Sequence, residues 1–150
     1  MTTQPPVIEG IHHLKFAVTD CDRSLAFYQQ VFGARRIPQA DHKDAGGNIY
    51  AYICDMPGWG TLLDLRLSQE HGSATRHFDP ITLTIEDRAA LAAWVRHLDT
   101  LGVAHSGEII TMLAFMLVIE DPDGRRIRLY TRQKHGPELP GQRDHPWMEM

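Results

Sequence analysis

Cysteine and long apolar runs are both scarce in this 150-residue chain. Its two cysteines, Cys21 and Cys54, form no CxxC pair, so the sequence contains neither a zinc ribbon nor a thioredoxin-like redox motif. No segment approaches the roughly 18 consecutive apolar residues of a membrane span, and no basic region followed by an apolar run opens the chain. We therefore expect a cytoplasmic protein with no membrane partner and with reduced, structural thiols.

Positive charge is also limited, because 15 Lys and Arg residues face 19 Asp and Glu residues and leave a net charge of -4. Lys and Arg are not concentrated in any segment, so nucleic acid is not an expected partner. The nine histidines show no HxH or HExxH spacing. What the chain does contain is 43% apolar residues, which is enough to fill the core of one domain of ordinary size.

A strand-helix unit occurs twice in the sequence. Residues 13–33 and 80–102 each begin with an alternating apolar strand, pass through an acidic turn and continue as an amphipathic helix that ends at glycine. Three more strands are expected after each helix, at residues 35–40, 48–55 and 61–68 and at residues 104–110, 112–119 and 126–131. The prediction is a single α+β domain of two βαβββ modules, at residues 11–68 and 80–131, with a linker at 69–79 and a tail at 132–150 to which we assign no structure.

Three sequence segments carry a resemblance. They are HLKFAVTD from His13, SLAFY from Ser24 with the later Phe32-Gly33, and EDPDG from Glu120 leading into Ile127. Over residues 11–131 they resemble the vicinal oxygen chelate superfamily of glyoxalase I, extradiol dioxygenases, fosfomycin-resistance transferases and bleomycin-resistance binding proteins. The resemblance implies a cupped, partly open barrel-like sheet with helices outside, a homodimer, and up to four metal ligands in the cup.

The resemblance places the four metal-ligand positions at His13, Asp64, Pro80 and Arg128. His13 matches the family, and Asp64 is a usable carboxylate. Pro80 has no donor atom, and the cation of Arg128 opposes a metal. We therefore expect no metal cofactor; a divalent ion, if one binds, would involve His13 and Asp64. A one-residue shift in the alignment would bring Asp79 inward near the third position.

Without a metal, the cup would be polar and more cationic than the whole chain. Alternation assigns these inward positions to it: His13, Lys15, Leu62, Asp64, Arg66, Thr82, Thr84, Arg126, Arg128 and Tyr130. One interpretation is a salt bridge between Asp64 and Arg128 that replaces the metal. Another is that Lys15, Arg66 or Arg128 binds the carboxylate, phosphate or phenolate of a small molecule.

Aromatic and sulfur-containing side chains would supply the apolar walls that ligand pockets require. The candidates are Tyr50, Tyr52, Trp59, Met112, Phe115 and Met116. The residues expected to bind ligand are then Lys15, Tyr50, Tyr52, Trp59, Arg66, Thr82, Arg128 and Tyr130.

The leading functional hypothesis is a glyoxalase-like protein with a degenerate metal site that binds a small anionic or aromatic molecule without metal. The alternative is a metal-dependent or metal-free lyase, isomerase or dioxygenase in which His13 and Asp64 are the catalytic residues. In the metal-free case Asp64 would orient His13 as a general base. A third hypothesis is an interaction module whose cup has no remaining function.

Overall fold

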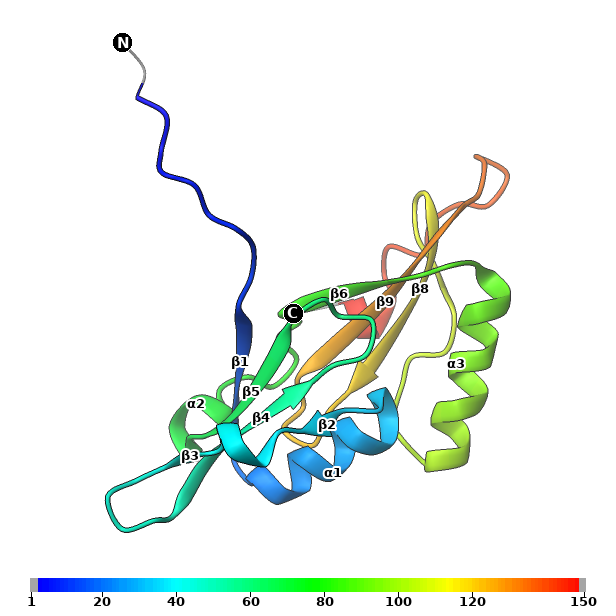
Figure 1. The fold of residues 1–150 in the computed structure, drawn as a ribbon. Helices are drawn as coiled ribbons and strands as arrows, with labels where there is room; N and C mark the ends of the chain where they lie inside the picture. The colour runs from blue at the N-terminus through cyan, green and yellow to red at the C-terminus, as the bar shows by residue number, and fades with distance from the viewer. Residues whose placement is uncertain (1–2, 149–150) are drawn as a thin grey trace.

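Two βαβββ modules follow one another in the computed structural model, which describes residues 3–148 (Figure 1). The first contains β1 (His13–Val18), α1 (Cys21–Phe32), β2 (Arg35–Arg36), the 3-10 helix η1 (Pro38–Ala40), β3 (His42–Lys43), β4 (Ile49–Asp55) and β5 (Leu62–Leu67). A short helix, α2 (Gln69–Ser73), leads to the second module. That module contains β6 (Ile81–Ile85), α3 (Arg88–Leu101), β7 (Ile109–Ile110), β8 (Ala114–Glu120) and β9 (Arg126–Lys134), and the 3-10 helix η2 (Pro146–Met148) follows it.

Each module builds its own sheet with the same topology. The first sheet has the order β1-β5-β4-β2, with β3 paired to β4, and the second has the order β6-β9-β8-β7. In both, the strand before the helix pairs in parallel with the last strand of the module, β1 with β5 and β6 with β9. The predicted α+β class and the repeated βαβββ order are confirmed. Within residues 3–148 no strand of one sheet pairs with a strand of the other, so the barrel is not closed by strand pairing inside one chain.

The two long helices begin and end by the same devices. Asp20 caps α1 by accepting a hydrogen bond from the Arg23 backbone N–H at 2.9 Å, and Asp87 caps α3 in the same way. Each helix ends at a glycine in the left-handed region, Gly33 with φ of 71° and Gly102 with φ of 67°. These local signals explain why both helices match the sequence prediction closely.

The helix-covered faces of both sheets share one hydrophobic core. Phe16 and Leu65 of the first sheet and Leu117 and Leu129 of the second belong to the same buried cluster. The helices α1 and α3 also touch each other, and the His97 ring of α3 lies 3.0 Å from a backbone carbonyl oxygen of α1. The helices therefore lie on the core side of the sheets, and the opposite face of each sheet is left for other contacts.

The turn between β8 and β9 fastens the two modules together. Asp121 in this turn accepts hydrogen bonds from the Tyr28 hydroxyl of α1 at 2.8 Å and from the Arg125 guanidinium at 2.7 Å. Asp123 accepts from the backbone N–H and the hydroxyl of Thr19, at 3.1 and 2.5 Å. Burial and the nearby charge of Asp121 raise the pKa of Tyr28 well above its ordinary value. The EDPDG segment that carries the family resemblance thus joins the second module to the first.

Several element boundaries differ from the sequence prediction. The strand expected at residues 35–40 stops at Arg36, because Pro38 cannot donate a backbone hydrogen bond and opens a 3-10 turn. The strand expected at 104–110 is reduced to Ile109–Ile110. The predicted linker at 69–79 contains α2, whose Gly72 packs so closely on the backbone of Val18 and Thr19 that a Cβ there would lie 2.9 Å from it.

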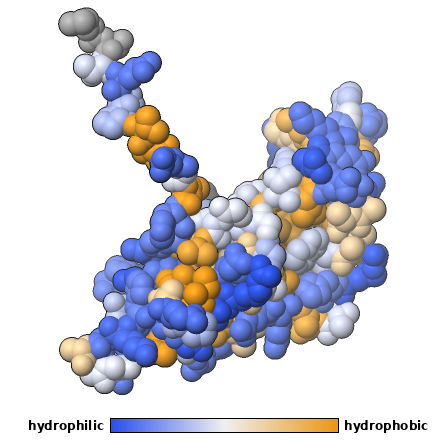
Figure 2. Space-filling model, in the orientation of Figure 1, coloured by the Kyte–Doolittle hydropathy of each residue, from blue (hydrophilic) through white to orange (hydrophobic). Residues whose placement is uncertain are grey.

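Ahead of β1, residues 3–12 form an extended arm that stands clear of the body (Figure 2). Its apolar side chains Val7 and Ile8 are 89% and 87% exposed. Among residues 3–148, no helix combines the length and the apolar character that crossing a membrane requires.

Candidate functional site

The first sheet presents a polar group on the face away from the helices. In the strand register Lys15 lies beside Asp64, and Arg66 lies two positions further along β5 on the same face. Asp64 is completely buried and accepts a hydrogen bond from Nη2 of Arg66 at 2.9 Å, while its Oδ1 has no hydrogen-bond partner among the described residues. The same Nη2 lies 2.9 Å from Nδ1 of His42, which must accept because a guanidinium can only donate.

The second sheet carries a matching polar group. Thr82 of β6 lies beside Arg128 of β9, and Tyr130 follows on the same face. Arg128 forms a salt bridge with Asp79, and its Nε is buried without a hydrogen-bond partner among residues 3–148. The inward position of Asp79 is the one that the shifted alignment anticipated.

These two local ion pairs correct the predicted salt bridge between Asp64 and Arg128. Asp64 pairs with Arg66 and Arg128 pairs with Asp79, each pair within one sheet. The prediction assumed that both sheets line one cup of the same chain. In the described chain, instead, the two sheets are linked through their helix-covered faces.

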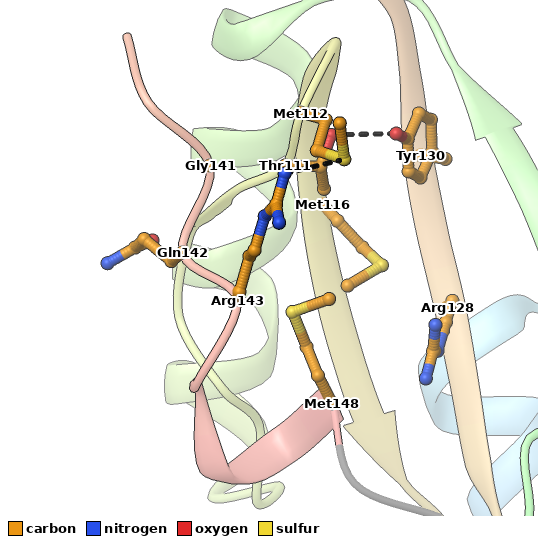
Figure 3. A pocket seen from close by; sticks show the side chains of 9 residues that line it. All are labelled: Thr111, Met112, Met116, Arg128, Tyr130, Gly141, Gln142, Arg143 and Met148. Carbon is orange, nitrogen blue, oxygen red and sulfur yellow. Dashed lines mark hydrogen bonds between the residues drawn. The ribbon is translucent and has the colours of Figure 1, made fainter.

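A pocket lies on the polar face of the second sheet. It encloses about 470 Å³ and is lined by Thr111, Met112, Met116, Arg128, Tyr130, Gly141, Gln142, Arg143 and Met148. Figure 3 shows most of these side chains over β8 and β9, beside the chain segment that carries Gly141 and Arg143, while Gln142 points away from them. Two ligand-binding predictions, Arg128 and Tyr130, therefore meet in one cavity together with the predicted wall residues Met112 and Met116.

The chain after β9, residues 135–148, forms one side of this pocket, and we call it the C-terminal strap. The strap starts at His135, whose ring nitrogens lie within 2.8 Å of the carbonyl oxygens of Gly136 and Thr111, and these contacts raise the pKa of the imidazole. Near its end, Trp147 and Met148 pack on Met116 and Val118, which face away from the helix-covered core. The sequence prediction assigned no structure to this tail, and the described part of it is folded against the second sheet.

The predicted aromatic wall is not assembled around this pocket. Tyr52 lies on the helix-covered face, where its hydroxyl donates to Asp22 of α1 at 2.5 Å. Trp59 packs in the core, with its ring centroid 5.5 Å from that of Phe32. Tyr50 lies beside the first polar group, with its ring centroid 5.5 Å from the Arg66 guanidinium carbon. Alternation had grouped Tyr50 with Tyr52, but the two rings lie in different surroundings, because Tyr52 pairs with Leu65 of β5 and its side chain points toward the core.

The predicted acid-base pair is not formed either. The His13 ring lies 2.9 Å from the ring of His12, whereas Asp64 is bound by Arg66. No hydrogen bond joins His13 to Asp64 among the described residues, although both side chains lie on the same face of the first sheet. The catalytic roles of the two residues remain predictions.

The residues present do not fit the metal site that the fold implies. Pro80 offers no donor atom, Arg128 places a cation at the fourth position, and Asp79 nearby is already bound to that cation. Residues 3–148 hold no cluster of three or more His, Cys, Asp and Glu side chains that could surround a metal ion.

Paired βαβββ modules, with polar groups on the sheet faces opposite their helices, define a two-module α+β fold. This chain belongs to the Glyoxalase/Bleomycin resistance protein/Dioxygenase superfamily, which its residues 10–129 match.

Curated relatives are distant. The chain is 25% identical over 127 residues to MhqA of Bacillus subtilis, whose name assigns it provisionally to the ring-cleaving dioxygenases, and it spans 40% of that protein's length. It is 28% identical over 134 residues to the metallothiol transferase FosB of Bacillus licheniformis, with 83% of this chain and 76% of that protein covered.

Solved structures confirm the fold. TnmS3, an antibiotic binding protein from Streptomyces sp. CB03234, superimposes with a TM-score of 0.67 at 23% identity over 86% of this chain and 100% of its own. The fosfomycin resistance protein FosX of Listeria monocytogenes gives a TM-score of 0.62 at 16% identity over 83% of this chain and 91% of its own. At these identities the likeness establishes architecture alone.

Proposed function

We propose that this chain is a metal-independent member of the superfamily that binds a small anionic or aromatic molecule on its polar sheet faces. Two ion pairs support the proposal: Asp64 with Arg66, and Asp79 with Arg128. They include Asp64 and Arg128, two of the positions that the family resemblance assigns to metal ligands. Guanidinium groups recognise carboxylates, phosphates and phenolates through a planar fork of donors. The chemistry at both half-sites is thus suited to holding an anion.

Both guanidinium groups keep donor capacity beyond their carboxylate partners. The Nε atoms of Arg66 and Arg128 are buried and have no hydrogen-bond partner within residues 3–148. A buried donor without a partner costs about 1–3 kcal/mol, so an acceptor from a ligand would be favoured at either position. Lys15 in the first sheet and Thr82 and Tyr130 in the second supply further polar groups on the same faces.

Elemental mass spectrometry of protein purified without a metal-affinity tag tests the proposal. We expect native protein to retain far less than one divalent ion per chain. Arg128→Glu should raise metal retention by replacing the opposing cation with a carboxylate beside Asp79, whereas the neutral control Arg128→Gln should not. Near-stoichiometric metal in the native protein, lost in His13→Ala, would overturn the proposal and favour a metalloenzyme.

An enzyme is the second candidate function, and one observation favours it. Asp64 is a fully buried carboxylate with one oxygen unpartnered among the described residues, on the same sheet face as His13. A small rotation of either side chain during ligand binding would let them share a proton in lyase, isomerase or dioxygenase chemistry. Unchanged turnover in both His13→Ala and Asp64→Asn would exclude this use of the two residues.

A homodimer in the cytoplasm is the assembly and location that we propose. The two polar sheet faces of one chain are not paired with each other, so a second copy could bring a first sheet opposite a second sheet and complete a cup. Cys21 and Cys54 are free thiols, and burial raises the pKa of each to about 11, which suits a reducing compartment. Light scattering across a dilution series tests the dimer: a constant monomer mass would contradict it.

A further inference from the structure

We propose that the C-terminal strap makes the polar face of the second sheet into a complete binding site of its own, for an organic anion with one acidic group and an aromatic body. The inference rests on the proposed function, because the ligand is a small anion bound without metal. It goes further by confining the site to one module and by assigning the tail a role in binding.

The strap is attached by bonds that fix its path. Gln142 pairs with Ile110 in both directions: its backbone N–H donates to the Ile110 carbonyl at 2.8 Å, and its side-chain Oε1 accepts from the Ile110 N–H at 2.8 Å. Gly141 passes so close to the turn between β7 and β8 that a Cβ would lie 3.0 Å from the backbone nitrogen of Met112 and 3.1 Å from the carbonyl carbon of Thr111. A larger residue at this position would force the strap or the turn to shift.

The far end of the strap is held by a second set of contacts. The Trp147 ring lies over the Arg126 guanidinium, with 4.8 Å between the ring centroid and the guanidinium carbon. Met148 and Trp147 pack on Met116 and Val118 of β8. The strap is thus anchored on both sides of the pocket, and the space between the anchors is an open pocket rather than packed side chains.

The walls of the pocket have a definite chemistry. Its volume of about 470 Å³ lies in the range of small-molecule sites. Three methionines, Met112, Met116 and Met148, contribute flexible thioethers that make favourable contacts with aromatic rings. Figure 3 shows Met116 and Met148 approaching each other from the sheet and from the strap. An aromatic body suits this part of the cavity.

Two cations define the other requirement of the ligand. Arg128 reaches the pocket with its Nε unsatisfied within the described residues, although Asp79 engages its Nη2. Arg143 lines the strap side, where its guanidinium meets Met112 sulfur at 3.8 Å and no carboxylate among residues 3–148. A strap that served packing alone would not need Arg143 at a cavity that Arg128 of β9 already lines. An acidic group on the ligand would satisfy the Nε of Arg128, and Arg143 adds positive charge on the strap side.

Methionine-methyl NMR with 2-naphthoate as the probe tests the site, and titration calorimetry on the same samples measures total binding. We expect the methyl resonances of Met112, Met116 and Met148 to move, and that of the core residue Met56 to stay in place. The affinity for the neutral analogue 2-naphthamide should be lower by a factor of about ten or more, because this analogue lacks the charge that the arginines recognise.

Matched variants separate the parts of the site. Arg128→Met, which keeps apolar bulk, and Gly141→Ala, which shifts the strap against the turn between β7 and β8, should each weaken naphthoate binding about tenfold. Gly136→Ala is the control for the second, because its Cβ would meet only the flexible carboxylate end of Glu138. Arg96→Met, at an exposed position of α3, should leave this binding unchanged.

The outcomes distinguish this inference from the proposed function. Calorimetric binding without methionine shifts, abolished by Lys15→Met, would overturn the strap site and leave metal-independent binding in place. No heat and no methyl shift at millimolar naphthoate would also overturn it, while the metal analysis judges the proposed function separately. Shifts confined to the three pocket methionines, with loss in Arg128→Met, would establish it.

Discussion

The two modules share a topology, but different parts of the chain cover their polar faces. In the second module the C-terminal strap crosses the face and encloses a pocket, whereas the ion pair of the first module lies under local side chains such as His42. Their last turns differ as well. The turn between β4 and β5 packs the half-buried Trp59 against the core, and the turn between β8 and β9 buries the Asp121 and Arg125 ion pair. One scaffold has therefore been completed in two ways, with apolar packing in one half and with charge in the other.

Removing the charge at the junction should have the largest effect. Asp121→Ala leaves the Arg125 guanidinium buried without its carboxylate and takes away the acceptor of Tyr28. We expect a loss of about 3–5 kcal/mol in the free energy of unfolding, measured by urea denaturation. The exposed control Asp144→Ala should stay within about 0.5 kcal/mol of native. A loss below about 1 kcal/mol would mean that the junction does not couple the modules.

Alkaline pH should weaken the first module selectively. Burial raises the pKa of Cys54 from 9.0 to about 11, and a hydrogen bond to Asp22 raises that of Tyr52 to about 12. A raised folded-state pKa gives stability that is complete below the unfolded value and is lost as pH rises through the folded value. For Cys54 the loss between pH 9 and 11 is on the order of 2 kcal/mol.

Unfolding of native protein and of Cys54→Ala at pH 8 and pH 11 measures this effect. The variant should lose less stability over the interval, and hydrogen exchange should accelerate in β4 before it does in β8. Equal losses in the two proteins would show that the buried thiol does not drive the alkaline instability.

The two ion pairs should differ in strength. Asp64 is completely buried, whereas the side chain of Asp79 is 14% exposed. Asp64→Ala is expected to cost about 1–3 kcal/mol and Asp79→Ala about 0.5–1 kcal/mol, because a charged hydrogen bond contributes more where its carboxylate is shielded from water. Double-mutant cycles with Arg66→Ala and Arg128→Ala give the pair energies. The reverse order would mean that the second half-site carries more of the stability.

The smallest global effect is expected at the strap. Trp147→Ala should lower the free energy of unfolding by about 1 kcal/mol or less, because it removes a half-buried ring that stacks on Arg126 and packs on β8 at the edge of the fold. Locally, exchange of the Ile110 amide proton, which is bonded to Gln142, should rise about tenfold by NMR. Arg132→Ala, on an exposed part of β9, is the control. Unchanged Ile110 protection would show that the strap is held without Trp147.

Local rules predicted the parts of the fold that depend on neighbours in sequence. Asp20 and Gly33 could be read as the ends of a helix because capping and the left-handed turn involve residues within one turn. Alternation also placed Lys15 and Asp64 on one face, and the two residues lie beside each other in the strand register. In the second sheet, Arg128 and Tyr130 were grouped correctly and line the same pocket.

Sequence reasoning missed whatever depends on contacts between distant segments. The strap has no periodic pattern, and its position follows from Gly141 and Gln142 meeting a strand edge about 30 residues earlier in the chain. Alternation cannot say which face of β4 is core until its partner strand is known, so Tyr52 was assigned to the wrong side. The pairing of Asp79 with Arg128 depended on an alignment shift that the sequence alone left open.

The fastening of the modules by Asp121 and Asp123 has a consequence for how such proteins diverge. Asp121 and Asp123 belong to the EDPDG segment that carries the family resemblance, and they join the two modules on the side away from the polar sheet faces. Selection for a stable junction between the modules can then preserve these motif residues, while the residues on the polar sheet faces change from metal ligands to ion pairs. A protein that diverges in this way keeps the sequence motif of its family while its binding function changes.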